Sequence, residues 1–519
     1  MEAALVTILI LILVLICTWK VLNWLWLRPK RLERLLREQG LHGNPYKLLV
    51  GDMKEIAKMR SEALSKPINL SHDIVPRVLP FDQYIVNKHG TNCFIWMGPS
   101  PRLTITDPDL IRDVFNKIND FNKPNIYVLN PLARLILPGL LRYEGEKWNK
   151  HRRIINPAFK MEKLKNMLPL FAECCDDMIG KWEEMVSTNG SCEVDVWPFL
   201  QNLASDVISR TSFGSSFEEG RRIFELLKEQ AKLISTIASK VYIPGWRFVP
   251  TPTHKRVKEI DRDIKASLKD IINKREKALK EGEATKNDLL DILLESNHRE
   301  IQEHGNNMNV GMNIEDVIEE CKLFYFAGQE TTAALLVWTM ILLSRYPDWQ
   351  VRAREEVLQI FGNRKLDVDG LSHLKIVTMV LYEVLRLYPP IIGFGRKIHK
   401  DVKLGNLSLP AGVQLLLPTV MVQHDCDLWG DDAKEIKSER FSEGVLKATN
   451  GKTSFFPFGG GPRICIGQNF SLLEAKIALS MILQHFSFEL SPTYTHAPFT
   501  VVTLQPHHGA YVILSKVKI

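Results

Sequence analysis

A cysteine in a glycine-rich segment is the residue of this chain best suited to bind a metal. Cys465 lies in the segment 455–474, FFPFGGGPRICIGQNFSLLE, which contains the pattern F-x-x-G-x-R-x-C-x-G. The five fixed positions of that pattern are Phe458, Gly461, Arg463, Cys465 and Gly467. Glycines permit positive φ and expose backbone N–H groups, and an apolar helix is expected to begin near Gln468. A cysteine just ahead of a helix N-terminus is expected to favour the thiolate, which is the form that binds metals.

Axial ligation of haem iron is the chemistry that such a thiolate suits. A thiolate ligand gives electron density to the iron and favours O–O bond cleavage, and Arg463 could reach an anionic haem propionate. A buried structural cysteine and a phosphate-binding glycine loop are the other interpretations of this segment. The phosphate loop is excluded because no G-K-[ST] sequence follows the glycines.

A second set of candidate residues lies in a long predicted helix, in the sequence AGQETT at 327–332. Gly328 weakens a helix by about 1 kcal/mol relative to alanine. The Thr331 hydroxyl can donate to the carbonyl of Ala327, which bends a helix and makes room for a small ligand such as O₂. Thr331 and Glu330 are then the candidate groups for proton delivery. Taken alone, the pattern also fits a helix that tolerates one glycine.

The cysteine segment resembles the haem-binding loop of the cytochrome P450 family. Three stretches, GLHGNPYKLLVGD, AGQETTA and FPFGGGPRICIGQNF, resemble the plant branch that contains secologanin synthase, and the resemblance covers almost the whole chain. It implies haem b with Cys465 as the axial iron ligand and O₂ as co-substrate. It also implies an O₂ and proton groove at Ala327, Gly328, Glu330 and Thr331, where the family often has Asp in place of this Glu.

Other matched positions place nitrogen donors near a haem. Trp148 and Arg152 stand at i and i+4, so they share one helix face and suit a haem propionate. By the same resemblance Arg396 matches a further propionate-binding position. Each arginine taken alone also fits an exposed surface charge.

An internal ion pair is predicted in a helix over 374–388. Glu383 and Arg386 lie at i and i+3 between apolar flanks, so burial is expected, and a buried pair needs a third partner. The resemblance supplies Arg440 from an E-R-F sequence, which completes a structural triad. The chain departs from the family pattern at Ser438, where Pro is usual, and at Ser471, where Ala is usual.

The N-terminus is predicted to be an uncleaved membrane anchor. Residues 3–27 form a nearly unbroken apolar run in which Lys20 is the only charge. Its length crosses a bilayer core of ~30 Å, and no small-x-small cleavage site follows. The basic residues after this run are Arg28, Lys30, Arg31, Arg34 and Arg37. Since none precedes it, the positive-inside rule places the remaining chain in the cytosol, as a single-pass protein of the endoplasmic reticulum membrane.

The rest of the chain is predicted to be one large domain. Residues 1–27 form the transmembrane anchor, 28–45 a basic flank and hinge, and 46–519 a mainly α domain with a small β component, as the cytochrome P450 fold implies. The expected long helix covers about 315–344, and short strands are expected at 102–106, 413–417 and 510–514.

The composition excludes several other classes of protein. The chain has 519 residues, with 67 Lys plus Arg against 60 Asp plus Glu, so its net charge of +7 gives no support for a nucleic-acid binder. Eight cysteines without a C-x-x-C pair do not make a disulfide scaffold or a zinc ribbon. Apart from Cys465 they are expected to be reduced, buried thiols.

The predicted function is that of a membrane-anchored haem-thiolate monooxygenase that oxidises an apolar, terpenoid-type substrate. No G-x-G-x-x-G sequence follows a predicted strand, so electrons from NADPH are expected through a partner, by resemblance NADPH–cytochrome P450 reductase. The basic stretch 147–165 is its candidate docking site, with an exposed helix face as the alternative.

Two other functions remain open at this stage. One is a haem-thiolate isomerase or dehydratase that does not use O₂, and the other is a non-catalytic, membrane-anchored haem- or ligand-binding protein. The resemblance places the substrate pocket at about 120–140, 324–327, 391–395 and 500–505. Phe324 in that set also fits an ordinary core residue.

Overall fold

The computed structural model describes most of the chain and divides it into two compact units. The described residues are 2–124, 135, 138–186, 190–214, 217–238, 251–281, 288–305, 307, 309–362 and 364–517. Unit 1 comprises Met1–Lys66, Ile74–Asn125 and Gly393–Val422. Unit 2 comprises Pro67–Asp73, Ile126–Ile392 and Gln423–Ile519. The single domain over 46–519 stays a prediction.

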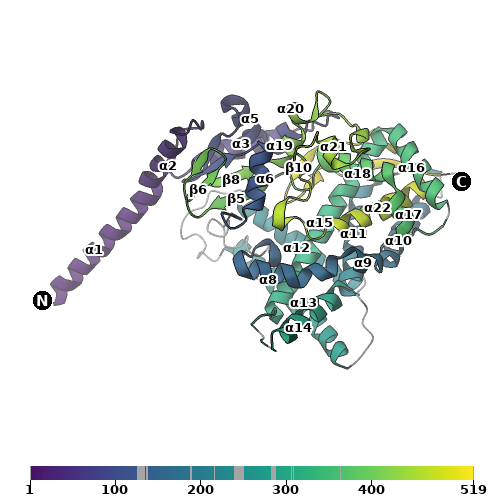
Figure 1. Ribbon diagram of the computed structural model, residues 1–519, viewed down its shortest axis with the longest axis horizontal. Helices are drawn as coiled ribbons and strands as arrows, with labels where there is room; N and C mark the ends of the chain where they lie inside the picture. The colour runs from purple at the N-terminus through teal and green to yellow at the C-terminus, as the bar shows by residue number, and fades with distance from the viewer. Residues whose placement is uncertain are drawn as a thin grey trace. The chain divides into compact units, whose positions relative to one another are not determined.

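The chain begins with one long helix, drawn in purple in Figure 1. Its parts are the helix α1 (Glu2–Leu22), the π-helix η1 (Asn23–Leu27) and the helix α2 (Arg28–Arg37). The stretch Ala4–Arg37 is long and apolar enough to cross a membrane, and its apolar window is not buried. The predicted flank and hinge over 28–45 is therefore helical as far as Arg37. Tyr46 fastens the helix to unit 1, because its hydroxyl donates to the carbonyl of Leu25 at 2.7 Å.

Unit 1 is built around a five-stranded sheet with the order β1-β2-β8-β5-β3. Its strands are β1 (Phe94–Met97), β2 (Ser100–Thr104), β3 (Phe121–Asn122), β5 (Phe394–Ile398) and β8 (Gln414–Leu417). All neighbours are antiparallel except β2 and β8, which are parallel. The remaining elements of this unit are α3 (Met53–Leu64), α4 (Val75–Val78), α5 (Pro80–His89), α6 (Pro108–Asn116), β6 (Val402–Leu404) and β7 (Leu407–Leu409). Phe81, Ile85, Cys93 and Ile95 form a buried cluster beneath α5.

Unit 2 is mainly helical. Its longer helices are α8 (Gly145–Ile155), α10 (Leu168–Val186), α11 (Val196–Phe213), α12 (Phe217–Ala238), α13 (Pro252–Lys280), α14 (Leu289–Glu303), α15 (Ile314–Arg345), α16 (Pro347–Phe361), α18 (Lys375–Leu387) and α22 (Gln468–His485). Its sheets are β4 (Ser191–Asp195) with β12 (Tyr511–Lys516) and β9 (Phe486–Leu490), and the pair β10 (Pro498–Thr500) with β11 (Leu504–Pro506). The predicted fold class is confirmed, because these units are helical with small sheets.

The helix α15 is the central element of unit 2 and matches the predicted helix over 315–344. Asn313 caps its start by accepting a hydrogen bond from the N–H of Asp316 at 2.8 Å, and Pro347 begins the next helix. Although α15 is apolar enough to cross a membrane, 83% of its apolar window is buried, so it is a core helix. It packs against α11, α13, α18 and α22.

The predicted ion-pair triad is present and buried. Arg386 donates to both carboxylate oxygens of Glu383, with Nη2–Oε1 at 2.7 Å and Nε–Oε2 at 2.9 Å, and neither side chain is exposed. Arg440 Nε lies 3.6 Å from Glu383 Oε1. The other N–H groups of Arg386 donate to the carbonyls of Gln423, Ala433 and Glu435. The guanidinium is therefore satisfied mainly by backbone carbonyls, with Arg440 at the edge of the cluster.

The eight cysteines are all free thiols, as predicted. Their predicted burial is correct for Cys93, Cys174, Cys175 and Cys321. It is wrong for Cys17 and Cys426, which are exposed, and for Cys192, which is half-buried. The composition predicts that a cysteine is a free thiol better than it predicts whether the cysteine is buried, because burial depends on neighbours that are distant in sequence.

Two buried histidines should make the fold sensitive to acid. His72 lies between the hydroxyls of Tyr388 and Tyr346, each 2.8 Å from a ring nitrogen, and His424 Nε2 lies 2.9 Å from the carbonyl of Leu387. Burial lowers the pKa of each from 6.5 to about 3. Below pH 6.5 these two histidines are therefore protonated in the unfolded chain but stay neutral in the folded chain. Each histidine should cost about 1.4 kcal/mol of stability per pH unit as the pH falls from 6.5 towards 3, and nothing above 6.5.

This pH dependence can be measured as the free energy of urea unfolding of the full chain in detergent, with the variant His424→Gln as comparison. Gln keeps an N–H donor for the Leu387 carbonyl but does not titrate. Its stability should fall less steeply with acid, by about 1.4 kcal/mol per pH unit. Parallel curves for the two proteins would show that His424 is not neutral in the fold.

Candidate functional site

The cysteine loop lies between a short 3₁₀ turn, η7 (Gly461–Arg463), and the start of α22. The N–H of Cys465 donates to the carbonyl of Phe458 at 3.0 Å, which closes the loop. Gly459 and Gly461 have φ of 74° and 63°, a conformation that explains why glycine occupies these positions. The loop therefore has the tight, glycine-dependent shape that the sequence predicts.

The electrostatics of Cys465 differ from the expectation for a cysteine beside a helix N-terminus. Burial raises the pKa of its thiol, and the N–H of Gly467 and the guanidinium of Arg152 act in the opposite direction without overcoming it. The expectation that the loop by itself favours the thiolate is therefore wrong, because desolvation of the sulfur has the larger effect. A bound iron would supply the missing positive charge, since metal ions deprotonate the thiols that bind them.

The donor set of the loop fits a haem. The Cys465 side chain carries exposed surface although protein surrounds it closely. In the part of the chain that the structure describes, no cluster of three or more His, Cys, Asp or Glu could hold a metal ion. A single cysteine with one backbone N–H and one guanidinium beside its sulfur suits a metal whose other ligands come from a macrocycle.

The helix α8 is fastened to the cysteine loop at the two residues that precede Cys465. Arg152 Nη1 donates to the carbonyl of Ile464 at 2.9 Å. The guanidinium of Arg463 lies 4.4 Å above the ring of the buried Trp148 and also pairs with Glu144. Trp148 and Arg152 thus each contact a residue of the loop. Their contact with a haem propionate stays a prediction.

A buried histidine and carboxylate join α8 to α15. His151 Nδ1 lies 2.6 Å from Glu320 Oε1, and neither side chain is exposed. The second oxygen of Glu320 accepts a hydrogen bond from the N–H of Leu140 at 3.0 Å. This pairing agrees with the interpretation that His151 is not a metal ligand, and it explains how α8 is held beside the core helix.

The fourth predicted propionate-binding residue, Arg396, lies in unit 1. It is a buried residue of β5, its Nη1 donates to the carbonyl of Gly395 at 2.8 Å, and its guanidinium stands 5.3 Å from the ring of Phe115. Its role towards a haem stays a prediction.

The predicted hydrogen bond in the middle of α15 is present, because Thr331 Oγ1 donates to the carbonyl of Ala327 at 2.8 Å. Gly328 has a second structural role, which the sequence does not reveal. A Cβ atom there would lie 2.8 Å from Cδ1 of Ile208 on α11, so glycine allows the two helices to pack closely. The glycine therefore serves close helix packing as well as helix weakening.

Glu330 points to a neighbouring hairpin. Its Oε2 accepts hydrogen bonds from Gln505 Nε2 at 2.7 Å and from Thr503 Oγ1 at 3.2 Å. Burial raises the pKa of its carboxyl, and these two donors only partly counteract the effect. The sequence missed Thr503 and Gln505, which lie about 175 residues further along the chain and carry no motif. Glu330 is thus a carboxyl whose proton is held more tightly than in water.

A second buried carboxyl lies close to the same part of α15. Glu474 on α22 is buried, and burial raises its pKa well above 4.5 despite a hydrogen bond with Thr332. Ser471, one of the departures from the family pattern, accepts a hydrogen bond from Thr332 Oγ1 at 3.1 Å. Ser471 and Glu474 therefore connect the residue after Thr331 to the helix that follows the cysteine loop, which the sequence did not predict.

The predicted pocket walls are described only in part. Of the range 120–140, residues 125–134 and 136–137 lie outside the described residues. Phe324 is buried, and its ring centroid lies 5.6 Å from that of Phe159, which in turn contacts Phe470. The aromatic contacts of Phe324 favour the interpretation of this residue as core.

The fold is shared with a solved structure, retinoic acid bound cyanobacterial CYP120A1, with a TM-score of 0.76 and 21% sequence identity over 92% of this chain and 99% of that one. The geometry above defines a helical protein in which one loop cysteine is available as an axial metal ligand. Residues 78–511 match the model of the family Cytochrome P450. The chain therefore belongs to the cytochrome P450 family and is a monooxygenase.

Plant relatives cover nearly the full length of the chain. Cytochrome P450 716A67 from Medicago truncatula is 61% identical over 504 residues, 97% of this chain and 96% of that one. The 11-oxo-beta-amyrin 30-oxidase of Glycyrrhiza uralensis is 58% identical over 514 residues, 98% of each chain. Cytochrome P450 CYP72A219 from Panax ginseng is 57% identical over 505 residues. The predicted relationship to a plant branch of the family is confirmed.

Proposed function

We propose that this chain is a membrane-anchored haem-thiolate monooxygenase that oxidises a terpenoid, with a triterpenoid as the first candidate. The observation that carries the proposal is its 58% identity, over 98% of both chains, to a protein named for the oxidation of 11-oxo-beta-amyrin. The sequences of α15 and of the cysteine loop favour O₂ chemistry over simple ligand binding. The acid–threonine pair Glu330–Thr331 and all five fixed positions of the cysteine loop are present.

In this proposal the haem supplies O₂ activation and Cys465 holds its iron. The Thr331 hydroxyl donates to the carbonyl of Ala327 in the middle of α15, which fixes the direction of its proton. Glu330 and Glu474 are candidate proton-holding carboxyls near this part of α15, because burial raises the pKa of each. Trp148 and Arg152 hold α8 against the loop, which fixes the loop around the sulfur.

Replacement of Thr331 by alanine tests the proposed proton delivery. Thr331→Ala should keep the haem but consume NADPH with little product, because the hydroxyl that positions the proton is lost. Thr339 gives a matched control, since its hydroxyl makes the same i−4 hydrogen bond in the same helix, at 2.7 Å to the carbonyl of Leu335. The ratio of product to NADPH, measured with reductase and beta-amyrin-type triterpenoids, should fall in Thr331→Ala alone. Equal ratios in both variants would remove Thr331 from the mechanism.

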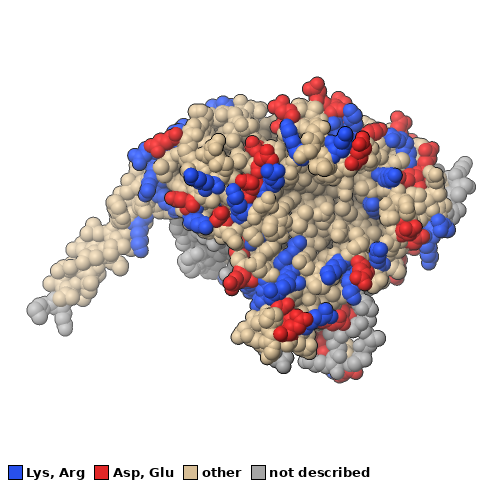
Figure 2. Space-filling view, in the orientation of Figure 1, with Lys and Arg blue, Asp and Glu red and all other residues tan. Residues whose placement is uncertain are grey.

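The anchor proposal places α1 across the endoplasmic reticulum membrane, with residues 28 onward in the cytosol. Exposed apolar side chains cover α1 from Leu5 to Leu22, and Lys20 is the single charge between residues 3 and 27. In Figure 2 the described outer part of this helix is tan, and blue side chains appear towards its other end, where Lys20 and the basic residues of α2 lie. An exposed apolar helix flanked by positive charge on one side has the pattern of a single-pass anchor.

The reductase is proposed to dock on part of the stretch 147–165. Blue side chains gather over α8 in Figure 2, but the four basic residues of α8 each have a partner within unit 2. These pairs are Lys147 with Asp316, Lys150 with the carbonyl of Gly311, Arg152 with that of Ile464 and Arg153 with Glu300. By contrast Lys160, Lys163 and Lys165 have no ion-pair partner among the described residues. The proposed docking charge is therefore concentrated in the second half of the stretch, where it can attract an acidic partner.

A further inference from the structure

The helix α2 presents its basic residues on two different faces. Its buried face consists of Pro29, Leu32, Glu33 and Leu36, which pack within unit 1. Arg31 and Arg34 lie on the opposite side, at positions i and i+3, where helix neighbours stand about 5–6 Å apart. The two sets of cations differ in their contacts with the protein, although Arg34 also lines an open pocket together with Lys30 and Arg37.

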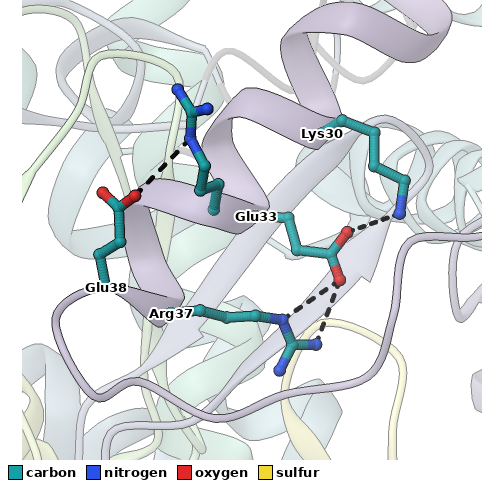
Figure 3. Close-up of a pocket in the computed structure, with 5 residues that line it drawn as sticks. Lys30, Glu33, Arg37 and Glu38 are labelled. Atoms are coloured by element: carbon teal, nitrogen blue, oxygen red, sulfur yellow. Dashed lines mark hydrogen bonds and ion pairs between the residues drawn. The ribbon is translucent and has the colours of Figure 1, made fainter.

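The inner set consists of Lys30 and Arg37, whose side chains are paired with groups of the protein. The carboxylate of the buried Glu33 pairs with Lys30 Nζ at 2.9 Å and with Arg37 Nη2 at 3.1 Å (Figure 3). Arg37 also donates to the carbonyl of Gly43 at 2.9 Å. These residues line an open pocket of about 540 Å³ together with Arg34 and Glu38. The pocket already contains its own counter-ion, so Lys30 and Arg37 fix α2 to unit 1 instead of attracting a distant anion.

The outer set, Arg31 and Arg34, remains available to bind an anion. Arg31 is exposed and has no hydrogen-bond or ion-pair partner in the part of the chain that the structure describes. Arg34 Nε lies 3.7 Å from Glu38 Oε1, with 72% and 60% of the two side chains exposed. An ion pair with that exposure is weak and opens easily. Two guanidinium groups one turn apart can bind one phosphate between them.

The position of this pair along the helix matches the depth of lipid headgroups. The apolar run ends at Leu27, so Arg31 and Arg34 lie about 6 and 10 Å beyond it at 1.5 Å per residue. The headgroup layer of one leaflet is about 5–7 Å thick. Helical side chains lean towards the N-terminus of their helix, which here is the membrane side. Arg31 and Arg34 therefore reach back into the headgroup layer, whereas Glu38 lies beyond it.

Aromatic rings mark the same boundary. Lys30 Nζ stands 5.4 Å from the ring centre of Trp26, and the ring of Tyr46 lies 6.3 Å from that of Trp26. Tryptophan and tyrosine are enriched where the hydrocarbon meets the headgroups. The Tyr46 hydroxyl bonded to Leu25 O keeps this end of the helix on unit 1, so the depth of α2 is fixed by the protein as well as by the anchor.

We propose that Arg31 and Arg34 form a binding surface for anionic phospholipids in the leaflet from which α1 emerges. The inference rests on the proposed membrane anchor and adds a lipid class to it. The negative surface of a cytoplasmic leaflet supplies the complementary charge. Zwitterionic lipid satisfies the anchor but offers these two arginines no net charge.

The test uses the full chain inserted in phosphatidylcholine vesicles that contain a minority of phosphatidylserine. A dansyl label is placed on either the phosphatidylserine or the phosphatidylcholine, and energy transfer from the protein tryptophans reports which lipid is enriched around the chain. The wild type should favour labelled phosphatidylserine. The variant Arg31→Gln/Arg34→Gln should lose about fivefold of that preference for each arginine removed. In 1 M salt, where the Debye length is about 3 Å, the wild-type preference should also disappear.

Matched variants separate local charge from total charge. Lys447→Gln/Lys452→Gln removes the same charge from exposed positions of unit 2 and should keep the preference. Arg31→Lys/Arg34→Lys keeps the charge and should keep most of it. An unchanged preference in Arg31→Gln/Arg34→Gln, or an equal loss in the unit 2 variant, would overturn the inference.

Insertion is scored separately from lipid preference. If wild-type chain stays in the vesicles after an alkaline carbonate wash but shows no lipid preference, the inference fails and the anchor stands. If the wash removes the chain from neutral and anionic vesicles alike, the anchor proposal fails and the inference fails with it.

Discussion

Replacing Cys465 by serine is expected to abolish the spectrum that a thiolate-ligated haem gives when reduced and bound to carbon monoxide, and to reduce turnover to background. A serine hydroxyl does not ionise under conditions in which an iron-bound thiol does, so the strong electron donation to the iron is lost. The expected result depends on one atom, because only Sγ changes to Oγ. The measurement is the reduced carbon monoxide difference spectrum of the purified full chain.

Cys426→Ser is the matched control for this experiment. Cys426 is also an exposed free thiol of unit 2 and stands just inside a short helix, α20 (Cys426–Trp429). Its replacement should leave the spectrum and turnover unchanged. If the thiolate-type spectrum survived in Cys465→Ser, or disappeared in both variants, the assignment of Cys465 as the ligand would be wrong.

Breaking the Glu383–Arg386 pair is expected to cost about 3–5 kcal/mol of stability, which is the usual effect of leaving one buried charge without its partner. Arg386→Ala leaves the carboxylate of Glu383 with Arg440, at 3.6 Å, as its remaining cation, and removes the guanidinium from the surrounding carbonyls. Since whole domains are stable by only about 5–15 kcal/mol, much of the variant should fail to fold. The yield of soluble folded chain and its thermal midpoint by circular dichroism measure the effect.

An exposed ion pair of the same unit provides the comparison. Arg352 Nη1 lies 2.8 Å from Glu439 Oε1, but the two side chains are 44% and 50% exposed. Arg352→Ala should therefore cost no more than about 1 kcal/mol. A similar loss in both variants would mean that burial does not distinguish the two pairs, and the structural role given to Glu383 and Arg386 would be wrong.

The parts of the structure that follow from local sequence were predictable. The core helix α15 and the helix α18 have apolar patterns that end at prolines, and the glycines of the cysteine loop require the backbone that they adopt. The bond from Thr331 to the carbonyl of Ala327 follows from their spacing of four residues. Each of these features depends on neighbours within a few residues.

The rest of the site depends on contacts between distant segments. Nothing near Glu330 in the sequence indicates that Thr503 and Gln505 bind it. Their spacing predicts that Trp148 and Arg152 lie on one face of α8. It does not predict the direction in which the Arg152 guanidinium points. Desolvation of Cys465 likewise depends on atoms from several segments, which is why the expected preference for thiolate was reversed. The sequence indicates which groups are present, and packing decides what each of them touches.

The joint between α1 and unit 1 has a mechanical consequence. Residues 3–27 make a helix about 37 Å long. As the proposed membrane anchor it would exceed a hydrocarbon core of ~30 Å and would have to tilt to fit. Because the helix continues through η1 into α2, and Tyr46 holds it at Leu25, unit 1 has to lean when the anchor leans. A thicker bilayer would bring this helix closer to the bilayer normal, and a thinner bilayer would increase its tilt. In the proposed arrangement, membrane thickness would set how the rest of unit 1 faces the lipid surface.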